Sequence, residues 1–404
     1  MATAALDTAD PLEAFRTEVR EWLEANFPKS MVGKGGAVMT PEGPDGLGPE
    51  GKAWRLAVGA KGWGTPTWPK EYGGGGLSRK EAAVVTQEMN RIGAWNPIGG
   101  MGTLMFGPTL LEFGSEEQKL RHMPSICNSD IRWCQGYSEP GAGSDLASLQ
   151  CFAEDAGDHY IVNGQKTWTS GGQWADWCFA LVRTDKLKKH EGITFLLIDM
   201  KSPGIEVKPI RMISGVSPFC ETFFTNVKVP KENRVGDEGF GWTIGKRLLQ
   251  HERTNLSGGA GPRMMMGGTQ SLSEIAKEAL GTDSEGRIAD AELRVRIAKF
   301  EMDWRAFLMT AMRVQQEAKA SGGVSVVSSI LKTVGTKLGQ ERSELLIEII
   351  GLQGLGWEGE GFSDTEIATT RGWLSGKATT IYGGSTEIQN NVVAKQILGM
   401  LDHQ

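Results

Sequence analysis

Long apolar runs, paired cysteines and clustered histidines are all missing from this sequence. No apolar stretch reaches the roughly 18 residues of a membrane span. The five cysteines are odd in number and show no CxxC spacing, which argues against a disulfide framework and a zinc site. The five histidines are scattered and no HExxH occurs, so no metal site is predicted.

Clustered positive charge is scarce as well. The formal net charge is −6, and the one short basic run, KLKK at 186–189, is interpreted as a solvated turn. This balance argues against a nucleic-acid-binding protein. The first residues, MATAALDTADP, lack the basic and apolar regions of a signal peptide, and their acids argue against a transit peptide. Together these absences predict a soluble cytoplasmic protein.

What is present divides into three compositional zones, which predict an α+β fold. Residues 1–130 are predicted to form an N-terminal helical domain, with Ser78 and Ser115 as helix N-caps. Residues 131–236 contain short strand-like runs and an Asn163-Gly164 hairpin signal, and predict an antiparallel β-barrel or sandwich. Residues 237–404 predict a C-terminal four-helix bundle, with long helices near 291–321 and 325–350.

Two motifs in the middle zone are candidates for ligand contact. In YSEPGAGSD (137–145), the small residues Gly141, Ala142 and Gly143 would let backbone approach a ligand closely; the alternative is a plain Pro-Gly turn. In NGQKTWTSGG (163–172), Trp168 could place an aromatic face beside a flat cofactor; the alternative is a tryptophan that anchors a strand end.

Two further motifs lie in the C-terminal zone. Glu252 follows Leu248 by four residues, so it falls toward the apolar stripe of its predicted helix, where a carboxylate is costly unless paired or functional. The alternative is an ordinary glutamate paired with Arg253. In TIYGGSTEIQNN (380–391), a glycine turn leads into a helix capped by Ser385, whose N–H groups could bind an anion or carbonyl or could simply start the helix.

These four segments, in this order and spacing, resemble the acyl-CoA dehydrogenase family over nearly the whole chain. YSEPGAGSD is similar to the family's TEPxAGSD signature, with Ser138 in place of threonine. The resemblance implies an α–β–α fold, non-covalently bound FAD, and a homodimer or homotetramer. It also implies an acyl-CoA substrate, electron-transfer flavoprotein as electron acceptor, and a bacterial cytoplasmic role in lipid β-oxidation.

The resemblance also implies roles for individual residues. Ser138 would hydrogen-bond the flavin ring, Ser144 would lie near the thioester, and Gly354 would approach the FAD diphosphate. The implied cofactor contacts are Gln135, Tyr137, Ser138, Gly143, Ser144, Trp168, Thr169, Ser170, Gly354, Ser385, Thr386 and Glu387. The implied substrate contacts are Ser144, Arg253, Tyr382, Gly383 and Gly384.

The catalytic base is the one position where family members differ. In medium-chain and short-chain members it directly follows the tyrosine of IYGG, which is Gly383 here. In isovaleryl-CoA and long-chain members it directly precedes an arginine on another helix, which here gives Glu252-Arg253. The resemblance therefore predicts that Glu252 removes the α-proton while flavin N5 takes the β-hydride. Gly383 would keep its N–H as a donor to the thioester oxygen.

One segment departs from the family pattern. Many members carry an Arg-x-x-Phe-Gly segment that contacts the partner's FAD adenine, and residues 263–292 contain none. This form resembles a bacterial branch that handles branched, cyclic or steroid side-chain CoA esters, sometimes as hetero-oligomers. The alternatives to a homo-oligomeric dehydrogenase are a flavin-dependent oxidase or monooxygenase on the same fold, and a subunit of a hetero-oligomeric dehydrogenase.

Overall fold

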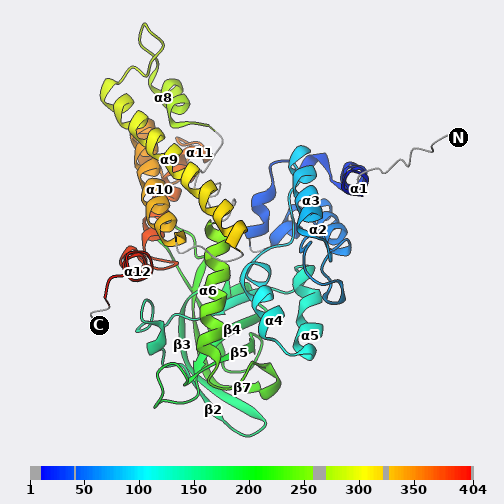
Figure 1. The fold of residues 1–404 in the computed structure, drawn as a ribbon. Helices are drawn as coiled ribbons and strands as arrows, with labels where there is room; N and C mark the ends of the chain where they lie inside the picture. The colour runs from blue at the N-terminus through cyan, green and yellow to red at the C-terminus, as the bar shows by residue number, and fades with distance from the viewer. Residues whose placement is uncertain (1–10, 41, 258–269, 322–326, 402–404) are drawn as a thin grey trace, which may run out of the picture. The chain divides into compact units, whose positions relative to one another are not determined.

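The computed structural model describes residues 11–40, 42–257, 270–321 and 327–401 (Figure 1). Two compact units emerge: the first unit comprises Met1–Pro209 with Phe219–Leu248, and the second unit comprises Ile210–Pro218 with Leu249–Gln404. Along the chain, helices come first, then strands, then helices again, so the predicted α–β–α order is confirmed. Among the described helices, none is long and apolar enough to cross a membrane.

The first unit begins with five helices, of which the first three pack around a tryptophan-rich core. These helices are α1 (Pro11–Asn26), α2 (Pro49–Ala60), α3 (Arg79–Arg91), α4 (Gly107–Phe113) and α5 (Glu116–Cys127). In the core, the Trp54 and Trp63 rings both contact the Trp22 ring, and Val19 and Leu23 of α1 are fully buried. The predicted caps are confirmed, because Ser78 and Ser115 each form a capping box with the residue three positions later.

The strands of the first unit form one eight-stranded sheet. They are β1 (Trp133–Gly136), β2 (Phe152–Asp155), β3 (His159–Ser170), β4 (Trp177–Arg183), β5 (Ile193–Asp199), β6 (Ile205–Ile210), β7 (Phe219–Pro230) and β8 (Arg234–Val235). The sheet is mainly antiparallel, but β1 and β2 lie parallel to β4. Strands β4 and β5 are buried along almost their whole length, because both of their faces are covered.

The predicted hairpin turn at Asn163-Gly164 is wrong. Strand β3 runs straight through these residues, and its pairing with β7 shifts by a bulge between Val162 and Gly164. The Asn163 side chain accepts a hydrogen bond from the backbone N–H of Asn226, 2.8 Å away on the partner strand. Gly164 adopts a φ of +145° at the bulge, so the Asn-Gly pair forms a bulge within one long strand and not a hairpin turn.

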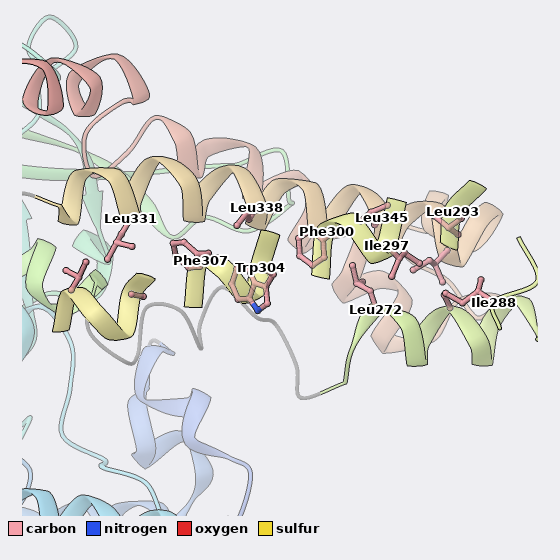
Figure 2. Close-up of a cluster of buried hydrophobic side chains, with 14 residues drawn as sticks. Leu272, Ile288, Leu293, Ile297, Phe300, Trp304, Phe307, Leu331, Leu338 and Leu345 are labelled. Atoms are coloured by element: carbon pink, nitrogen blue, oxygen red, sulfur yellow. The ribbon is translucent and has the colours of Figure 1, made fainter. Parts of the chain in front are cut away.

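The second unit is built around α10, which packs against four other helices of this unit, α8, α9, α11 and α12. The bounds of its helices are α6 (Gly241–Ser257, shared with the first unit), α8 (Leu272–Leu280), α9 (Ala291–Ser321), α10 (Ser328–Ile350), α11 (Asp364–Gly376) and α12 (Thr386–Val392). Figure 2 shows the apolar side chains that α8, α9 and α10 direct toward one another, with Trp304 and Phe307 at the middle of the cluster. The two long predicted helices are α9 and α10.

Candidate functional site

The loop of residues 137–145 leaves the end of β1 and folds back on itself. Glu139 and Ala142 exchange two backbone hydrogen bonds of 3.0 Å, which close the Pro140-Gly141 turn. Gly141 and Gly143 are exposed, and a Cβ added to either glycine would meet nothing within 4 Å. Open space at both glycines is what close approach of a ligand to this backbone requires.

Behind this loop, the Glu139 carboxylate points inward. It lies 2.7 Å from the ammonium of Lys166 on β3, and the Lys166 side chain is fully buried. The carboxylate also accepts hydrogen bonds from the backbone N–H groups of Gln150 and Cys151, at 2.6 and 2.9 Å. Glu139 therefore holds the loop together from inside, while Ser144 and Asp145 are exposed.

Trp168 stands out on β3 because its backbone is strained. It has a φ of +59°, which is rare for a bulky L-residue, and the pairing with β7 shifts between Lys166 and Thr169. Its indole is 53% exposed and contacts the Phe219 ring edge-on at 6.0 Å. Strain of this kind persists only where neighbouring structure enforces it, and it concentrates at functional sites.

The loop and the end of β3 are joined directly. The backbone N–H of Thr167 donates to the carbonyl of Ser138 at 2.8 Å, which brings Ser138 and Trp168 into the same part of the first unit. Tyr137 is buried with its ring edge-on to Phe179 and Phe195.

The remaining predicted residues of the first unit differ in exposure. Gln135 and Ser170 are half-buried, whereas Thr169 is fully buried and its hydroxyl accepts a hydrogen bond from Thr222. Of these three residues, Gln135 and Ser170 leave part of their surface open to a ligand.

The second unit contains the other predicted group, at the turn before α12. Gly383 and Gly384 adopt φ values of +66° and +92°, a left-handed conformation that favours glycine. The Gln389 side chain donates to the Gly383 carbonyl at 3.1 Å, and a Cβ at Gly384 would lie 2.4 Å from the Gln389 amide nitrogen. The conformation of the turn therefore favours glycine at both positions.

Lys332 of α10 ties this turn to the helix beneath it. Its ammonium donates to the carbonyls of Thr379 and Gly384, at 2.9 and 2.8 Å, and burial lowers the pKa of Lys332. Tyr382 stands at the outside of the turn, with 53% of its surface exposed.

Ser385 caps α12 as predicted, since its hydroxyl accepts from the Ile388 N–H. Thr386 and Glu387 occupy the first turn of this helix. The backbone N–H of Glu387 itself and the Ser385 hydroxyl lower the pKa of the Glu387 carboxyl. Gly354 lies elsewhere in the second unit, where its carbonyl accepts from Thr370 of α11 at 3.1 Å.

The structure describes the backbone of the predicted base but not its side chain. Helix α6 extends to Ser257, so Glu252 and Arg253 lie within it, one turn after the fully buried Leu248. The side chains of Glu252 and Arg253 lie outside the described residues, as do residues 258–269 of the segment that lacks Arg-x-x-Phe-Gly. In the described ranges, no cluster of His, Cys, Asp or Glu is arranged to hold a metal ion.

Sequence reasoning missed Lys166 and Lys332, the two lysines that fix the loop and the turn. Lys166 lies in NGQKTWTSGG between Gln165 and Thr167, and it is the one charged residue from Ile161 to Ser170, which is a usable signal. Lys332 carries no such signal, because its partners are backbone carbonyls 47 and 52 residues away.

The similarity to known proteins extends over nearly the whole chain. Sequence profiles of the acyl-CoA dehydrogenase N-terminal, middle and C-terminal domains match residues 10–130, 134–227 and 239–398. "Acyl-CoA dehydrogenase IpdE1" of Mycolicibacterium smegmatis is 34% identical over 409 residues, covering 96% of this chain and 98% of that protein.

Two solved structures show the same fold. The ChsE4-ChsE5 complex from Mycobacterium tuberculosis matches with a TM-score of 0.73 at 30% identity, over 98% of this chain and 100% of that one. The structure titled "Tcur3481-Tcur3483 steroid ACAD" matches with a TM-score of 0.74 at 29% identity, over 98% and 99%. On these matches, the chain belongs to the acyl-CoA dehydrogenase family of oxidoreductases.

Proposed function

We propose that this protein catalyses FAD-dependent α,β-dehydrogenation of an acyl-CoA thioester, with Glu252 as the base. The observation that carries the proposal is the open glycine loop of residues 137–145, fastened beside the exposed and strained Trp168. Family membership implies an FAD flavoprotein, and the three domains that we propose are residues 1–130, 131–236 and 237–404.

The residues present fit a flat cofactor. Exposed glycines permit close backbone approach, Ser138 and Ser144 offer hydroxyls on the same loop, and the Trp168 indole offers an apolar face. Ser170 and Gln135 would complete the contacts from the first unit, whereas Thr169 and Tyr137 are buried and would support the site from within. Gly354, Ser385, Thr386 and Glu387 would supply those of the second unit.

The chemistry divides between cofactor and protein. FAD, when bound, supplies the hydride acceptor. Glu252 takes the proton from the α-carbon, so that loss of one proton and one hydride leaves a carbon–carbon double bond. Exclusion of water by the bound acyl chain would raise the pKa of this carboxyl and strengthen it as a base. The Gly383 N–H donates to the thioester oxygen and stabilises the enolate-like charge.

The test is anaerobic reduction of the purified flavoprotein by a panel of straight, branched and cyclic acyl-CoA esters, followed by the loss of flavin absorbance. Wild-type protein should be bleached by at least one ester. The Glu252→Gln variant should be bleached at least about a thousand-fold more slowly, because the base itself is lost while the flavin stays bound.

Glu278→Gln, which changes an exposed carboxylate on α8, is the matched control and should bleach at the wild-type rate. Bleaching of Glu252→Gln at the control rate would refute the base assignment. A wild-type protein that holds FAD but is not bleached by any ester, and is rapidly reoxidised by O₂ after chemical reduction, would favour the oxidase or monooxygenase.

We also propose that the substrate is a branched, cyclic or steroid side-chain ester, because a solved relative is titled a steroid ACAD. Another relative is described as a ChsE4-ChsE5 complex, which makes a hetero-oligomer a second candidate beside the homodimer or homotetramer. Light scattering with flavin quantification distinguishes them: one FAD per chain in the isolated homo-oligomer argues against a need for a second subunit. Electron-transfer flavoprotein is the proposed acceptor.

A further inference from the structure

A buried ion pair lies between the two segments of the first unit that would face the flavin. The Lys166 side chain is fully buried and that of Glu139 is 6% exposed, and their charged atoms are 2.7 Å apart. Neither residue is among the proposed contacts to cofactor or substrate. Each charge is instead satisfied by the other and by backbone groups.

Those backbone groups belong to both segments. The Lys166 ammonium also donates to the carbonyl of Tyr137 at 3.1 Å. The Glu139 carboxylate accepts hydrogen bonds from the N–H groups of Gln150 and Cys151. These two residues end the segment of residues 137–151, which begins with the glycine loop. One pair of side chains therefore joins the start of this segment, its end and strand β3.

A second buried cation holds the same segment further along. The Arg183 guanidinium donates to the carbonyls of Ala147 and Leu149, at 2.7 and 2.9 Å, and is itself only 5% exposed. Residues 137–151 are thus fixed at three places by groups that lie beneath them. These buried contacts support the exposed residues of the loop, including Ser144.

The pair lies next to the strained residue. Trp168 follows Lys166 by two positions, and the ladder with β7 breaks between Lys166 and Thr169. Ser138 precedes Glu139, and its carbonyl accepts from the Thr167 N–H. Ser138 and Trp168 therefore each lie within two residues of a member of the pair.

We infer that the Lys166–Glu139 pair is a positioning unit that sets the separation of Ser138 and Trp168 for the flavin ring. The inference rests on the proposed function. A buried ion pair is a poor source of stability, since apolar residues of similar volume often serve as well. Its directional hydrogen bonds to three backbone groups, those of Tyr137, Gln150 and Cys151, instead define one geometry, which a preorganised binding site needs.

The experiment compares two double variants of the flavoprotein. Lys166→Met/Glu139→Gln removes both buried charges together and so leaves no uncompensated ion. The control, Lys231→Met/Asp155→Asn, removes a partly exposed ion pair between the residue that follows β7 and the last residue of β2, and the side chains of this pair do not bond to residues 137–151. The measurements are circular dichroism, the dissociation constant for FAD, the absorption spectrum of bound flavin and its reduction potential.

The buried-pair variant should keep a native circular dichroism spectrum, bind FAD about ten-fold or more weakly, and show a shifted flavin spectrum and potential. The control should match wild type in all four. A natively folded buried-pair variant with wild-type affinity, spectrum and potential would overturn the inference. The proposed function fails separately, if wild-type protein binds no FAD or is bleached by no ester.

If the double variant fails to fold, the Lys166→Arg variant provides the second test of the inference. It keeps the buried charge but cannot place a guanidinium where the ammonium meets both Tyr137 and Glu139. We expect an altered flavin spectrum and potential in a protein that keeps its native circular dichroism spectrum; an unaltered spectrum and potential would overturn the inference.

Discussion

At the scale of single residues, Gly383 illustrates how backbone conformation constrains chemistry. Its φ of +66° is a left-handed conformation, so any side chain there is strained. A carboxylate at this position, where the family resemblance places the base of medium-chain members, would carry that strain. A base supplied from helix α6 removes the conflict, which agrees with the proposed role of Glu252.

The strain at this position can be measured. Gly383→Ala should lower the free energy of unfolding by about 1 kcal/mol, because alanine must adopt the left-handed conformation. The control is Gly372→Ala inside α11, where an added Cβ meets nothing within 4 Å and alanine should stabilise by roughly 0.5–1 kcal/mol. Urea unfolding of both variants gives the comparison. A Gly383→Ala protein as stable as wild type would show that the turn relaxes freely.

At the scale of elements, α3 depends on its cap. Ser78 and Glu81 form a reciprocal capping box that satisfies two backbone N–H groups. Ser78→Ala should therefore cost about 1 kcal/mol of unfolding free energy. Thr86→Ala in the same helix removes only a hydroxyl that bonds the Ala82 carbonyl, and should be neutral or slightly stabilising. Equal effects of the two substitutions on urea unfolding would contradict the role of the box.

Elements specified by local chemistry are the ones that sequence predicts well. The caps at Ser78, Ser115 and Ser385 depend on residues three positions away, so they can be identified without knowing the fold. The Asn163-Gly164 signal failed because pairing with distant β7 decided the conformation. A local sequence pattern cannot predict non-local strand pairing of this kind.

The candidate site divides in the same way. Its small residues and its tryptophan are recognisable in the sequence, because they lie in short contiguous motifs. The supporting contacts of Lys332, whose partners lie 47 and 52 positions further along the chain, come from the packing of α10 against the turn. Motifs therefore predict the surface of this site, and only the folded chain shows what holds it in place.

At the scale of the whole molecule, buried ionisable groups set the response to acid. His122 is 2% exposed between the Trp133 and Trp177 rings, and among the described residues its Nε2 has no hydrogen-bond partner. Burial lowers its pKa to about 4 from 6.5. Glu88 is held by hydrogen bonds from Arg20, then Arg91 and Arg16, which lower its pKa to about 2 from 4.5.

The two shifts act in different pH windows. As pH falls from 6.5 toward 4, the unfolded chain binds a proton at His122 that the folded protein resists, so stability falls by up to about 3 kcal/mol. As pH falls from 4.5 toward 2, protonation of Glu88 in the unfolded chain lowers the stability by about 2 kcal/mol more. This figure already allows for the solvent around the three arginines, which weakens their interaction with the carboxylate.

Urea unfolding across pH separates the two groups. His122→Phe should flatten the dependence between pH 6.5 and about 4 while leaving stability above pH 6.5 unchanged or increased, because phenylalanine fits between two indoles without an ionisable nitrogen. Glu88→Gln should be less stable near neutrality, since three arginines lose their shared carboxylate, but should lose less stability below pH 4.5. Each variant is the control for the other, and a His122→Phe protein with the wild-type slope would show that acid sensitivity arises elsewhere.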